Sequence, residues 1–283
     1  MRPAQPVPLA AVSWDIAIPS QPGRLKGVTM AGFSDRATAL VDIPVVPHPA
    51  VMVLIDLGEG VVVDDGTGQQ LRDSVVVGLA PIGVRGQGGR TFECLQLRLS
   101  PLVAHTVLGG SSELGGTVVA LDDLWGRDAV RTQDQLRGAG SWEDRFAIVE
   151  TALARRHDAG RAVDPEIAFA WEKMVTSRGR IRVERLAADA GWSRKRLWSR
   201  FGSQIGLTPK RAARLIRFDG AAHRLAAGHS AAAVAAESGY ADQSHFHRDV
   251  MDFAGTTPSA VAIAPFLAVD DVAWSARKHT SGI

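Results

Sequence analysis

The sequence predicts an α+β protein with a β-rich N-terminal half and an all-helical C-terminal half. Short apolar runs separated by Gly, Pro and Asp clusters occur before residue 100, whereas helical periodicity dominates after it. The chain has 283 residues, a length at which proteins usually divide into domains. A duplicated motif near the C-terminus, described below, supports the helical assignment of the second half.

The N-terminal half is predicted to form many short strands. Residues 1–22 are Pro-rich and expected to be irregular, and the Gly-containing stretches 64–68 and 83–89 are expected to be hairpin turns or loops. The runs with the composition of strands are 50–57, 60–63, 73–79 and 93–99. Short strands separated by turns predict a cupin-like sandwich or a small barrel.

Helical patterns follow from Pro101 onward. Residues 101–108 and 121–130 are predicted to be short helices, and Ser141 is predicted to cap a longer helix that ends near Asp158. The apolar residues of the longer helix are spaced four, three and four apart, at Trp142, Phe146, Val149 and Leu153. We expect this stripe to pack against its own domain, and the alternative is a dimer seam.

The domain boundary is predicted at a linker over residues 159–163. The N-terminal domain then spans residues 1–158, the helical domain 164–265, and a tail 266–283. Asp164 is expected to cap the first helix of the second domain, with Pro165 at its first position. Thr208 is expected to cap a long helix with a buried stripe at Leu215, Phe218, Ala222 and Leu225. Together with the repeats, these signals predict about seven helices.

Two segments of the helical domain resemble each other, residues 186–209 and 234–258. Each contains an apolar helix, a Gly-containing turn and a second helix that begins at a capping residue, Ser193 or Asp242. The copies match at Ala187 and Ala235, Gly191 and Gly239, Trp192 and Tyr240, Gly206 and Gly255, and Pro209 and Pro258. This order of elements is typical of the helix-turn-helix motif, whose second helix enters the major groove of DNA. We call the second helices the first and second recognition helices.

Charge is divided unevenly between the two halves. Residues 178–260 contain 14 Lys and Arg against 7 Asp and Glu, a net charge of +7, whereas the remainder of the chain carries −5. Concentrated positive charge on a small domain favours binding to the phosphates of nucleic acid. Without the repeat, a solvated Arg-rich surface would be the simpler interpretation.

Helical periodicity selects the side chains that would contact DNA. Because Leu197 and Phe201 mark the buried face of the first recognition helix, and Phe246, Val250 and Phe253 that of the second, other positions face outward. The residues expected to contact bases are Lys195, Arg196, Trp198, Ser199, Gln243, Ser244, His247 and Arg248. Those expected to contact phosphates are Ser193, Arg194, Arg200, Lys210 and Arg211. The helix between the repeats, roughly 210–227, is about 27 Å long, so the two units can approach adjacent turns of B-DNA.

The helical domain resembles the DNA-binding domain of the AraC/XylS family of bacterial transcription regulators. The matching residues are Leu186-Ala187, Gly191, Ser193, the pair Leu197 and Phe201, Gly206-Leu-Thr-Pro209, Gly239-Tyr240, Asp242-Gln-Ser-His-Phe246, Arg248 and Gly255-Thr-Thr-Pro258. The resemblance implies seven helices, with two recognition helices in consecutive major grooves of double-stranded DNA. It also implies a sensory or dimerisation role for the N-terminal domain, a homodimer, a contact with RNA polymerase and a possible small-molecule effector.

The chain departs from the family pattern at three positions. A basic residue common in the first recognition helix is replaced by Ser199, and Asp249 and Asp252 stand late in the second. Carboxylates near phosphates would repel them, so we expect the second unit to bind DNA more weakly than the first.

Other functions find little support in the sequence. No P-loop, Gly-x-Ser-x-Gly motif or His-x-His pair in the strands occurs, so we expect no cofactor, no metal and no enzymatic activity. The single cysteine, Cys94, fits a reducing compartment and is expected to be an inert thiol. With no long apolar run, we expect a cytoplasmic protein without membrane contact. Two alternatives remain: a small-molecule-binding or enzymatic N-terminal domain with a vestigial DNA-binding tail, and a non-specific nucleoid protein.

Overall fold

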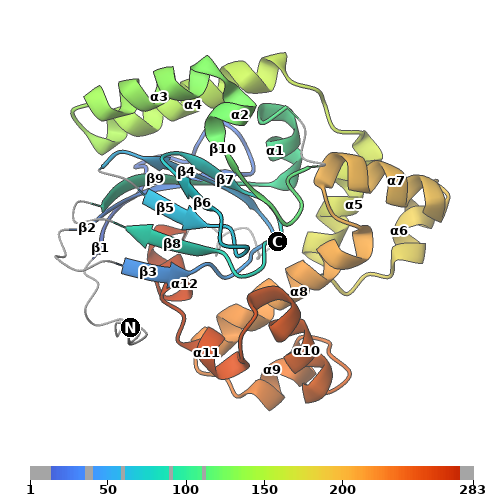
Figure 1. The fold of residues 1–283 in the computed structure, drawn as a ribbon. Helices are drawn as coiled ribbons and strands as arrows, with labels where there is room; N and C mark the ends of the chain where they lie inside the picture. The colour runs from blue at the N-terminus through green and yellow to red at the C-terminus, as the bar shows by residue number, and fades with distance from the viewer. Residues whose placement is uncertain (1–13, 36–40, 59–60, 89–91, 110–112, 275–283) are drawn as a thin grey trace.

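The N-terminal region contains two antiparallel sheets, and the C-terminal region is helical (Figure 1). The structure is a computed structural model that describes residues 14–35, 41–58, 61–88, 92–109 and 113–274. The α+β fold class predicted from the sequence is confirmed.

The larger sheet has six strands in the order β1-β2-β9-β4-β7-β10. Their bounds are Trp14–Ala17, Val28–Asp35, Phe92–Leu99, Val51–Asp56, Val75–Val77 and Val118–Ala120. The smaller sheet has the order β3-β8-β5-β6, with bounds Val41–Pro44, Arg85–Gly88, Val61–Asp64 and Gln70–Arg72. The runs predicted as strands correspond to β4, β5, β7 and β9. The sequence misses the other six: β1 lies in the stretch expected to be irregular, β8 in the stretch expected to be a loop, and β2, β3, β6 and β10 lie where no particular strand was predicted.

Both faces of the larger sheet are buried, as strand β9 illustrates. Leu95, Leu97 and Leu99 belong to a core on the outer face, where helices α3 and α4 cover the sheet. Cys94 lies on the opposite face, in a second core between the two sheets. Burial raises the pKa of the Cys94 thiol well above its ordinary value, as does the nearby charge of Asp56. An inert thiol is therefore the better interpretation.

Four helices complete the N-terminal region: α1 (Pro101–Val107), α2 (Leu121–Trp125), α3 (Arg127–Gly138) and α4 (Trp142–Ala159). Ser141 caps α4, because its hydroxyl accepts a hydrogen bond from the amide of Asp144 at 3.1 Å. Phe146, Val149 and Leu153 of α4 are buried in the core of their own domain. The stripe therefore packs inward, as expected, and is not available as a dimer seam.

The helical region begins with α5 (Pro165–Thr176) and continues through α6 (Val183–Asp189), α7 (Arg194–Ile205), α8 (Pro209–Ala226), α9 (Ala231–Glu237), α10 (Gln243–Ala254) and α11 (Pro258–Ala262). These are the seven helices that the sequence predicts. The predicted stripe of α8, Leu215, Phe218, Ala222 and Leu225, is buried. Among the described residues, no single helix has the length and hydropathy of a membrane crossing, and only α10 with the helices after it passes jointly, across a 66° bend.

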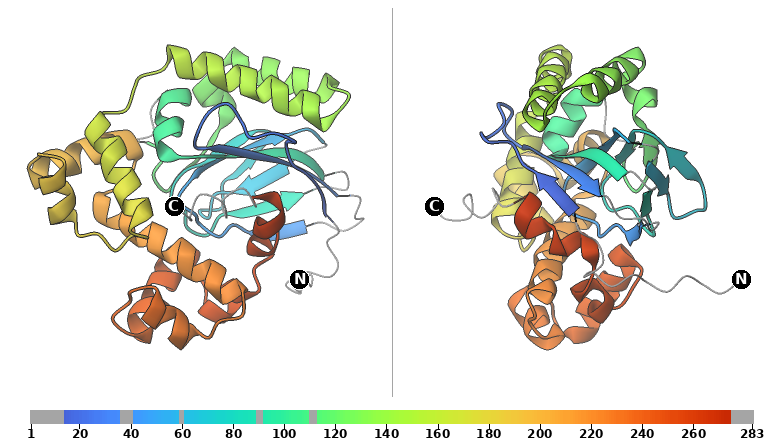
Figure 2. Two further views of the ribbon diagram at one scale, coloured as in Figure 1. Left: turned by 180° about the vertical axis from the view of Figure 1, so that it is seen from behind. Right: turned by 90° about the vertical axis from the view of Figure 1, so that its left-hand side faces the viewer.

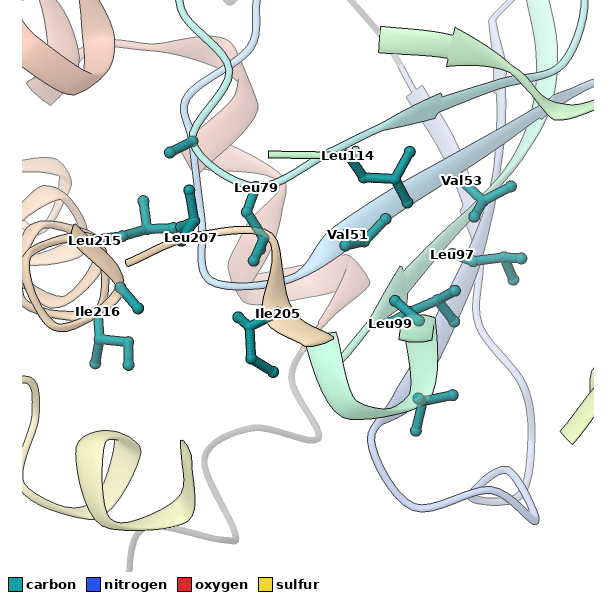
Figure 3. Packing of buried hydrophobic residues seen from close by; sticks show 14 of the residues in the cluster. Val51, Val53, Leu79, Leu97, Leu99, Leu114, Ile205, Leu207, Leu215 and Ile216 are labelled. Carbon is teal, nitrogen blue, oxygen red and sulfur yellow. The ribbon is translucent and has the colours of Figure 1, made fainter. Parts of the chain in front are cut away.

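The two regions share one hydrophobic core. Ile205, the last residue of α7, and Leu207, which follows that helix, pack in the same cluster as Val51 and Leu79 of the β-rich region (Figure 3). Helix α1 also packs against α7. At this contact the backbones nearly touch, since a Cβ on Gly115 would lie 2.0 Å from the carbonyl oxygen of Gly206. The first helix-turn-helix unit is therefore seated directly on the N-terminal region.

The segment expected to be a tail instead forms two short helices, α12 (Pro265–Ala268) and α13 (Asp270–Ala273). It leaves α11 and returns to the β-rich region (Figure 2). Helix α12 contacts β3, helix α13 contacts β1, and Trp274 is buried in the core between the sheets. We call residues 264–274 the C-terminal strap.

Candidate nucleic-acid interface

Both helix-turn-helix units form as the repeat predicts. The hydroxyl of Ser193 accepts a hydrogen bond from the amide of Arg196 at 3.2 Å, and the carboxylate of Asp242 accepts one from the amide of His245 at 2.6 Å. Each side chain satisfies an amide at the start of a recognition helix, which is α7 in the first unit and α10 in the second. The cap of α8 at Thr208 is made in the same way.

The glycines shared by the repeats have a common backbone reason. Gly191 and Gly239, in the turns, have φ of 67° and 78°, and Gly206 and Gly255, which end α7 and α10, have φ of 84° and 63°. Residues other than glycine rarely adopt this left-handed conformation without strain. Duplication therefore preserves the residues that stop one helix and turn the chain into the next.

The apolar residues of the recognition helices face inward. Leu197 and Phe201 of α7 are fully buried, as are Phe246, Val250 and Phe253 of α10. This confirms the buried faces that the sequence predicts. Every residue expected to contact bases, on either helix, has an exposed side chain.

The two recognition helices border one groove of about 1020 Å³. Lys195 and Trp198 of α7 lie on its wall, with His245 and Arg248 of α10. Basic side chains from α8 and from the segment between α5 and α6 line the rest: Arg180, Arg182, Lys210, Arg214 and Arg217. The two helices therefore act on one surface, and that surface has the charge that DNA phosphates require.

The groove contains basic residues that the sequence analysis did not select. Arg214 and Arg217 follow Arg211 at intervals of three along α8, a spacing that places all three near one face of a helix. This spacing is visible in the sequence, but Arg214 lies one turn before Phe218 of the buried stripe, so helical periodicity did not place it on an exposed face. Arg180 and Arg182 precede the first repeat, so the repeat did not point to them.

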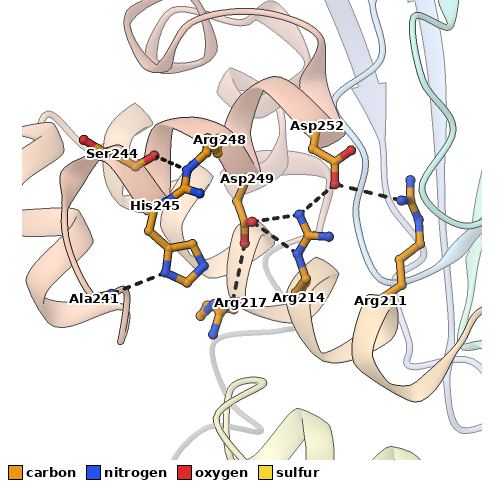
Figure 4. Close-up of polar contacts among 9 residues, drawn as sticks. All are labelled: Arg211, Arg214, Arg217, Ala241, Ser244, His245, Arg248, Asp249 and Asp252. Atoms are coloured by element: carbon orange, nitrogen blue, oxygen red, sulfur yellow. Dashed lines mark hydrogen bonds and ion pairs between the residues drawn. The ribbon is translucent and has the colours of Figure 1, made fainter.

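Asp249 lines the groove but is not an open carboxylate, because Arg214 and Arg217 bind it (Figure 4). It is buried, and its oxygens accept hydrogen bonds from Arg214 at 2.8 Å and from Arg217 at 3.4 Å. Asp252 also pairs with Arg214, at 2.7 Å, and lies 3.9 Å from Arg211. The expectation that both aspartates would repel phosphate needs correction for Asp249, because two guanidinium groups neutralise it. Its role is to fix α10 against α8.

The remaining candidate residues differ in their surroundings. Arg194 and Lys210 line the groove, and the guanidinium of Arg196 lies over the ring of Trp192 at 4.3 Å. Arg211 lies over the ring of Phe253 at 5.3 Å. The exposed residues Ser199, Gln243, Ser244 and His247 do not line the groove wall. They stay predicted base contacts on the outer surfaces of the helices.

Arg200 and Asp164 form a pair that the sequence did not predict. Two nitrogens of Arg200 donate to the carboxylate of Asp164 at 2.7 and 2.8 Å. Asp164 precedes α5, but its side chain makes no hydrogen bond to the first turn of that helix. Asp164 therefore occupies the N-cap position of α5, as predicted, but its carboxylate pairs with a cation in place of a backbone amide. This pairing favours a structural role for Arg200 at the end of the linker over a phosphate contact.

A histidine links the helical domain to the C-terminal strap. His223, in the last turn of α8, bridges that helix and the strap, with Nε2 2.9 Å from Asp270. Within the described ranges, no three His, Cys, Asp or Glu side chains are placed to hold a metal ion.

A protein-family model supports the assignment of the repeats as a helix-turn-helix domain. The family model of a helix-turn-helix domain matches residues 186–262, which contain both repeats. No curated protein matches the chain in sequence. Among solved structures, the chain is similar to ToxT from Vibrio cholerae O395, with 11% identity, a TM-score of 0.46, and coverage of 85% of this chain and 99% of that one. It is also similar to unsaturated fatty acid bound wild-type ToxT from Vibrio cholerae strain SCE256, with 10% identity, a TM-score of 0.46, and coverage of 86% and 97%.

The class of protein follows from these findings. A β-rich region joined to two helix-turn-helix units, with both recognition helices on one basic groove, defines a protein with a DNA-binding domain. The matched family model identifies that domain, over residues 186–262, as a helix-turn-helix domain.

Proposed function

We propose that this chain binds double-stranded DNA sequence-specifically, through two neighbouring major grooves, and thereby regulates transcription. The observation that carries the proposal is the shared groove, because it puts Lys195 and Trp198 of one recognition helix on the same surface as Arg248 of the other. Phosphate contacts from the basic residues would set affinity, and the exposed side chains of the recognition helices would select the sequence.

The test is a selection of DNA fragments by the full chain from a random pool, followed by a gel-shift titration. We expect enrichment of one sequence pattern, binding that weakens steeply with salt, and competition by the selected DNA far stronger than by random DNA. Equal competition by both would contradict the proposal and support a non-specific nucleoid protein. Failure to bind any DNA would leave the vestigial-tail alternative.

The N-terminal region offers a site for a small apolar effector, which is a second part of the proposal. A cavity of about 100 Å³ lies between the two sheets, lined mainly by apolar residues such as Phe33, Leu54 and Val61. An apolar cavity of about 150 Å³ admits benzene, so benzene would have to widen this smaller cavity slightly. The apolar lining favours a small hydrophobic ring or short chain over a sugar or a nucleotide, which would need several polar partners.

Benzene serves as the probe for this cavity. We expect it to raise the melting temperature of the full chain, and we expect Leu54→Trp, which fills the cavity, to remove the effect. Val130→Trp, at an exposed position of α3, is the matched control and should leave the benzene effect intact. A shift that Leu54→Trp does not reduce would place benzene elsewhere.

The proposal includes two macromolecular partners of this regulator, RNA polymerase and a second copy of the chain, both implied by the AraC resemblance. Sedimentation of the full chain with and without its selected DNA tests the homodimer. Transcription from a promoter carrying the selected sequence, with purified polymerase, tests the second contact and gives the sign of regulation. Action in the cytoplasm, where DNA and polymerase are found, belongs to the same proposal.

A further inference from the structure

The C-terminal strap is held by a charged cluster inside the β-rich region. Asp270 of α13 accepts hydrogen bonds from two nitrogens of Arg98, on β9, at 3.0 and 2.6 Å. Both side chains are almost completely buried. The guanidinium of Arg98 also lies over the ring of Trp274 at 4.3 Å and that of Phe266 at 5.1 Å. One arginine thus fastens both ends of the strap.

The same strap reaches the helix-turn-helix domain. The second oxygen of Asp270 lies 2.9 Å from His223 of α8, the helix that joins the two units. At its other end the strap continues directly from α11, which packs against α8. Ile263, which is 76% exposed, connects α11 to the strap. The C-terminal strap is therefore joined to the strands by the buried ion pair of Asp270 and Arg98. It is joined to the helix-turn-helix domain by the contact of Asp270 with His223 and by its covalent connection to α11.

The strap also forms one wall of the apolar cavity. Pro265, Phe266 and Val269 line it, facing residues of both sheets. His48 stacks on the ring of Phe266 at 6.0 Å from the other side. Anything that enters the cavity must therefore touch the segment that leads to α11. The first helix-turn-helix unit contacts the N-terminal region elsewhere, through α1, through Gly115 and through the cluster that joins Ile205 and Leu207 to Val51 and Leu79.

We infer that the C-terminal strap transmits occupancy of the apolar cavity to the second helix-turn-helix unit. The occupant presses on Phe266 and Val269, and because the strap is rigidly fastened at Arg98, the displacement passes to α11 and α10. The ligand class is that of the proposed effector, a small apolar molecule, and the inference rests on that part of the proposed function. Regulation would then act on the second recognition helix more than on the first.

The experiment makes the connection between the strap and α11 flexible and leaves the strap itself in place. An insertion of about six alternating Gly and Ser residues between Ile263 and Ala264 leaves α12, α13 and Trp274 free to dock but breaks the rigid connection to α11. The contacts of the strap with α8, including that of Asp270 with His223, are kept. Val272→Ala, in the strap but 55% exposed, is the matched control. Hydrogen exchange is measured on the full-length natural chain and both variants, with and without saturating benzene.

In all three proteins we expect benzene to slow exchange in β4 and β9, which border the cavity. In the natural chain and in Val272→Ala, exchange in α10 and α11 should also change, by about twofold or more, whereas in the insertion variant it should not. Slowed exchange in the strands with no change in α10 and α11 of the natural chain would overturn the inference and leave the cavity proposal standing. An equal change in α10 and α11 of the insertion variant would overturn it too. No effect on the strands in any protein would overturn both the cavity proposal and the inference.

Discussion

His223 shows how much a single residue contributes to the contact between regions. Its Nδ1 lies 2.8 Å from the carbonyl oxygen of Asp219, and its Nε2 faces Asp270, which also binds Arg98. Burial alone would lower the pKa of His223, but the hydrogen bond to Asp270 and the charge of Asp219 raise it to about 9. The pKa of Asp270, which burial alone would raise, is held well below its ordinary value by His223 and Arg98. We therefore expect a protonated histidine at neutral pH.

Stability should consequently depend on pH through His223. A histidine with a raised pKa in the folded protein stabilises it fully below the unfolded pKa, about 6.5, and loses that contribution as pH rises through the folded pKa. Between pH 6.5 and about 9 the free energy of unfolding should fall by about 1–2 kcal/mol, allowing for solvent screening of a side chain that is 35% exposed. Urea unfolding of the natural chain and of His223→Gln measures this difference, and equal pH slopes would refute it.

At this scale the sequence predicts local contacts well and distant ones poorly. The caps at Ser141, Ser193, Thr208 and Asp242 involve amides three residues away, so the local pattern is sufficient. The side chains of Asp164 and His223 instead find partners 36 and 47 residues away in the chain. Only the fold brings such partners together, and the choice between a cap and an ion pair depends on them.

Among the elements, the second recognition helix makes the most specific prediction. Arg248 is exposed on the groove wall, whereas Lys210 lines the groove at the start of α8. We expect Arg248→Ala to reduce the discrimination against a wrong base pair at one position of the site, by about 1–3 kcal/mol of binding free energy. We expect Lys210→Ala to weaken binding to all DNA sequences alike and to lower the slope of log affinity against log salt by about 1. Titration of selected and single-base-altered DNA distinguishes the two effects. Uniform loss from both variants would reject the assignment of Arg248.

Asp252 tests whether acidic residues weaken the second unit. Unlike Asp249, it is partly exposed, and it pairs with Arg211 and Arg214 in the groove. Asp252→Asn should release these cations toward phosphate, so that DNA of any sequence binds more tightly and the salt slope steepens by about 1. Asp123→Asn controls for net charge, because Asp123 is an exposed acid on α2, distant along the chain from the residues that line the groove. An equal gain from both variants would show an effect of total charge alone.

Elements with strong periodicity are those that the sequence locates. The helices of the repeats and the buried strand β9 have clear patterns, whereas β8 consists of Arg85-Gly-Gln-Gly88 and has no apolar alternation. Its backbone pairs with β3 and β5 on both sides, and backbone groups need no particular side chain to pair. The strap is hidden for a related reason, because its helices are only four residues long and depend on partners as distant as Arg98.

The packing of the two regions against each other depends on the contact between the first helix-turn-helix unit and the N-terminal region. Because a side chain on Gly115 would collide with the backbone of Gly206, Gly115→Ala should destabilise the protein by about 1–3 kcal/mol. Gly138→Ala is the matched control, since nothing lies within 4 Å of its Cβ position, and it should be neutral or slightly stabilising. Thermal unfolding measures both. A Gly115→Ala protein as stable as the control would mean that the contact can relax.

The most direct test of the central claim is a major-groove footprint of the full chain on its selected DNA, by methylation protection. If both recognition helices act from one surface, protected guanines should form two windows on the same face of the duplex, about one helical turn or 10–10.5 base pairs apart. Substitutions at Lys195 and Arg248 should each weaken one window only. A single window that loses strength with either substitution, or two windows on opposite faces of the duplex, would contradict the account.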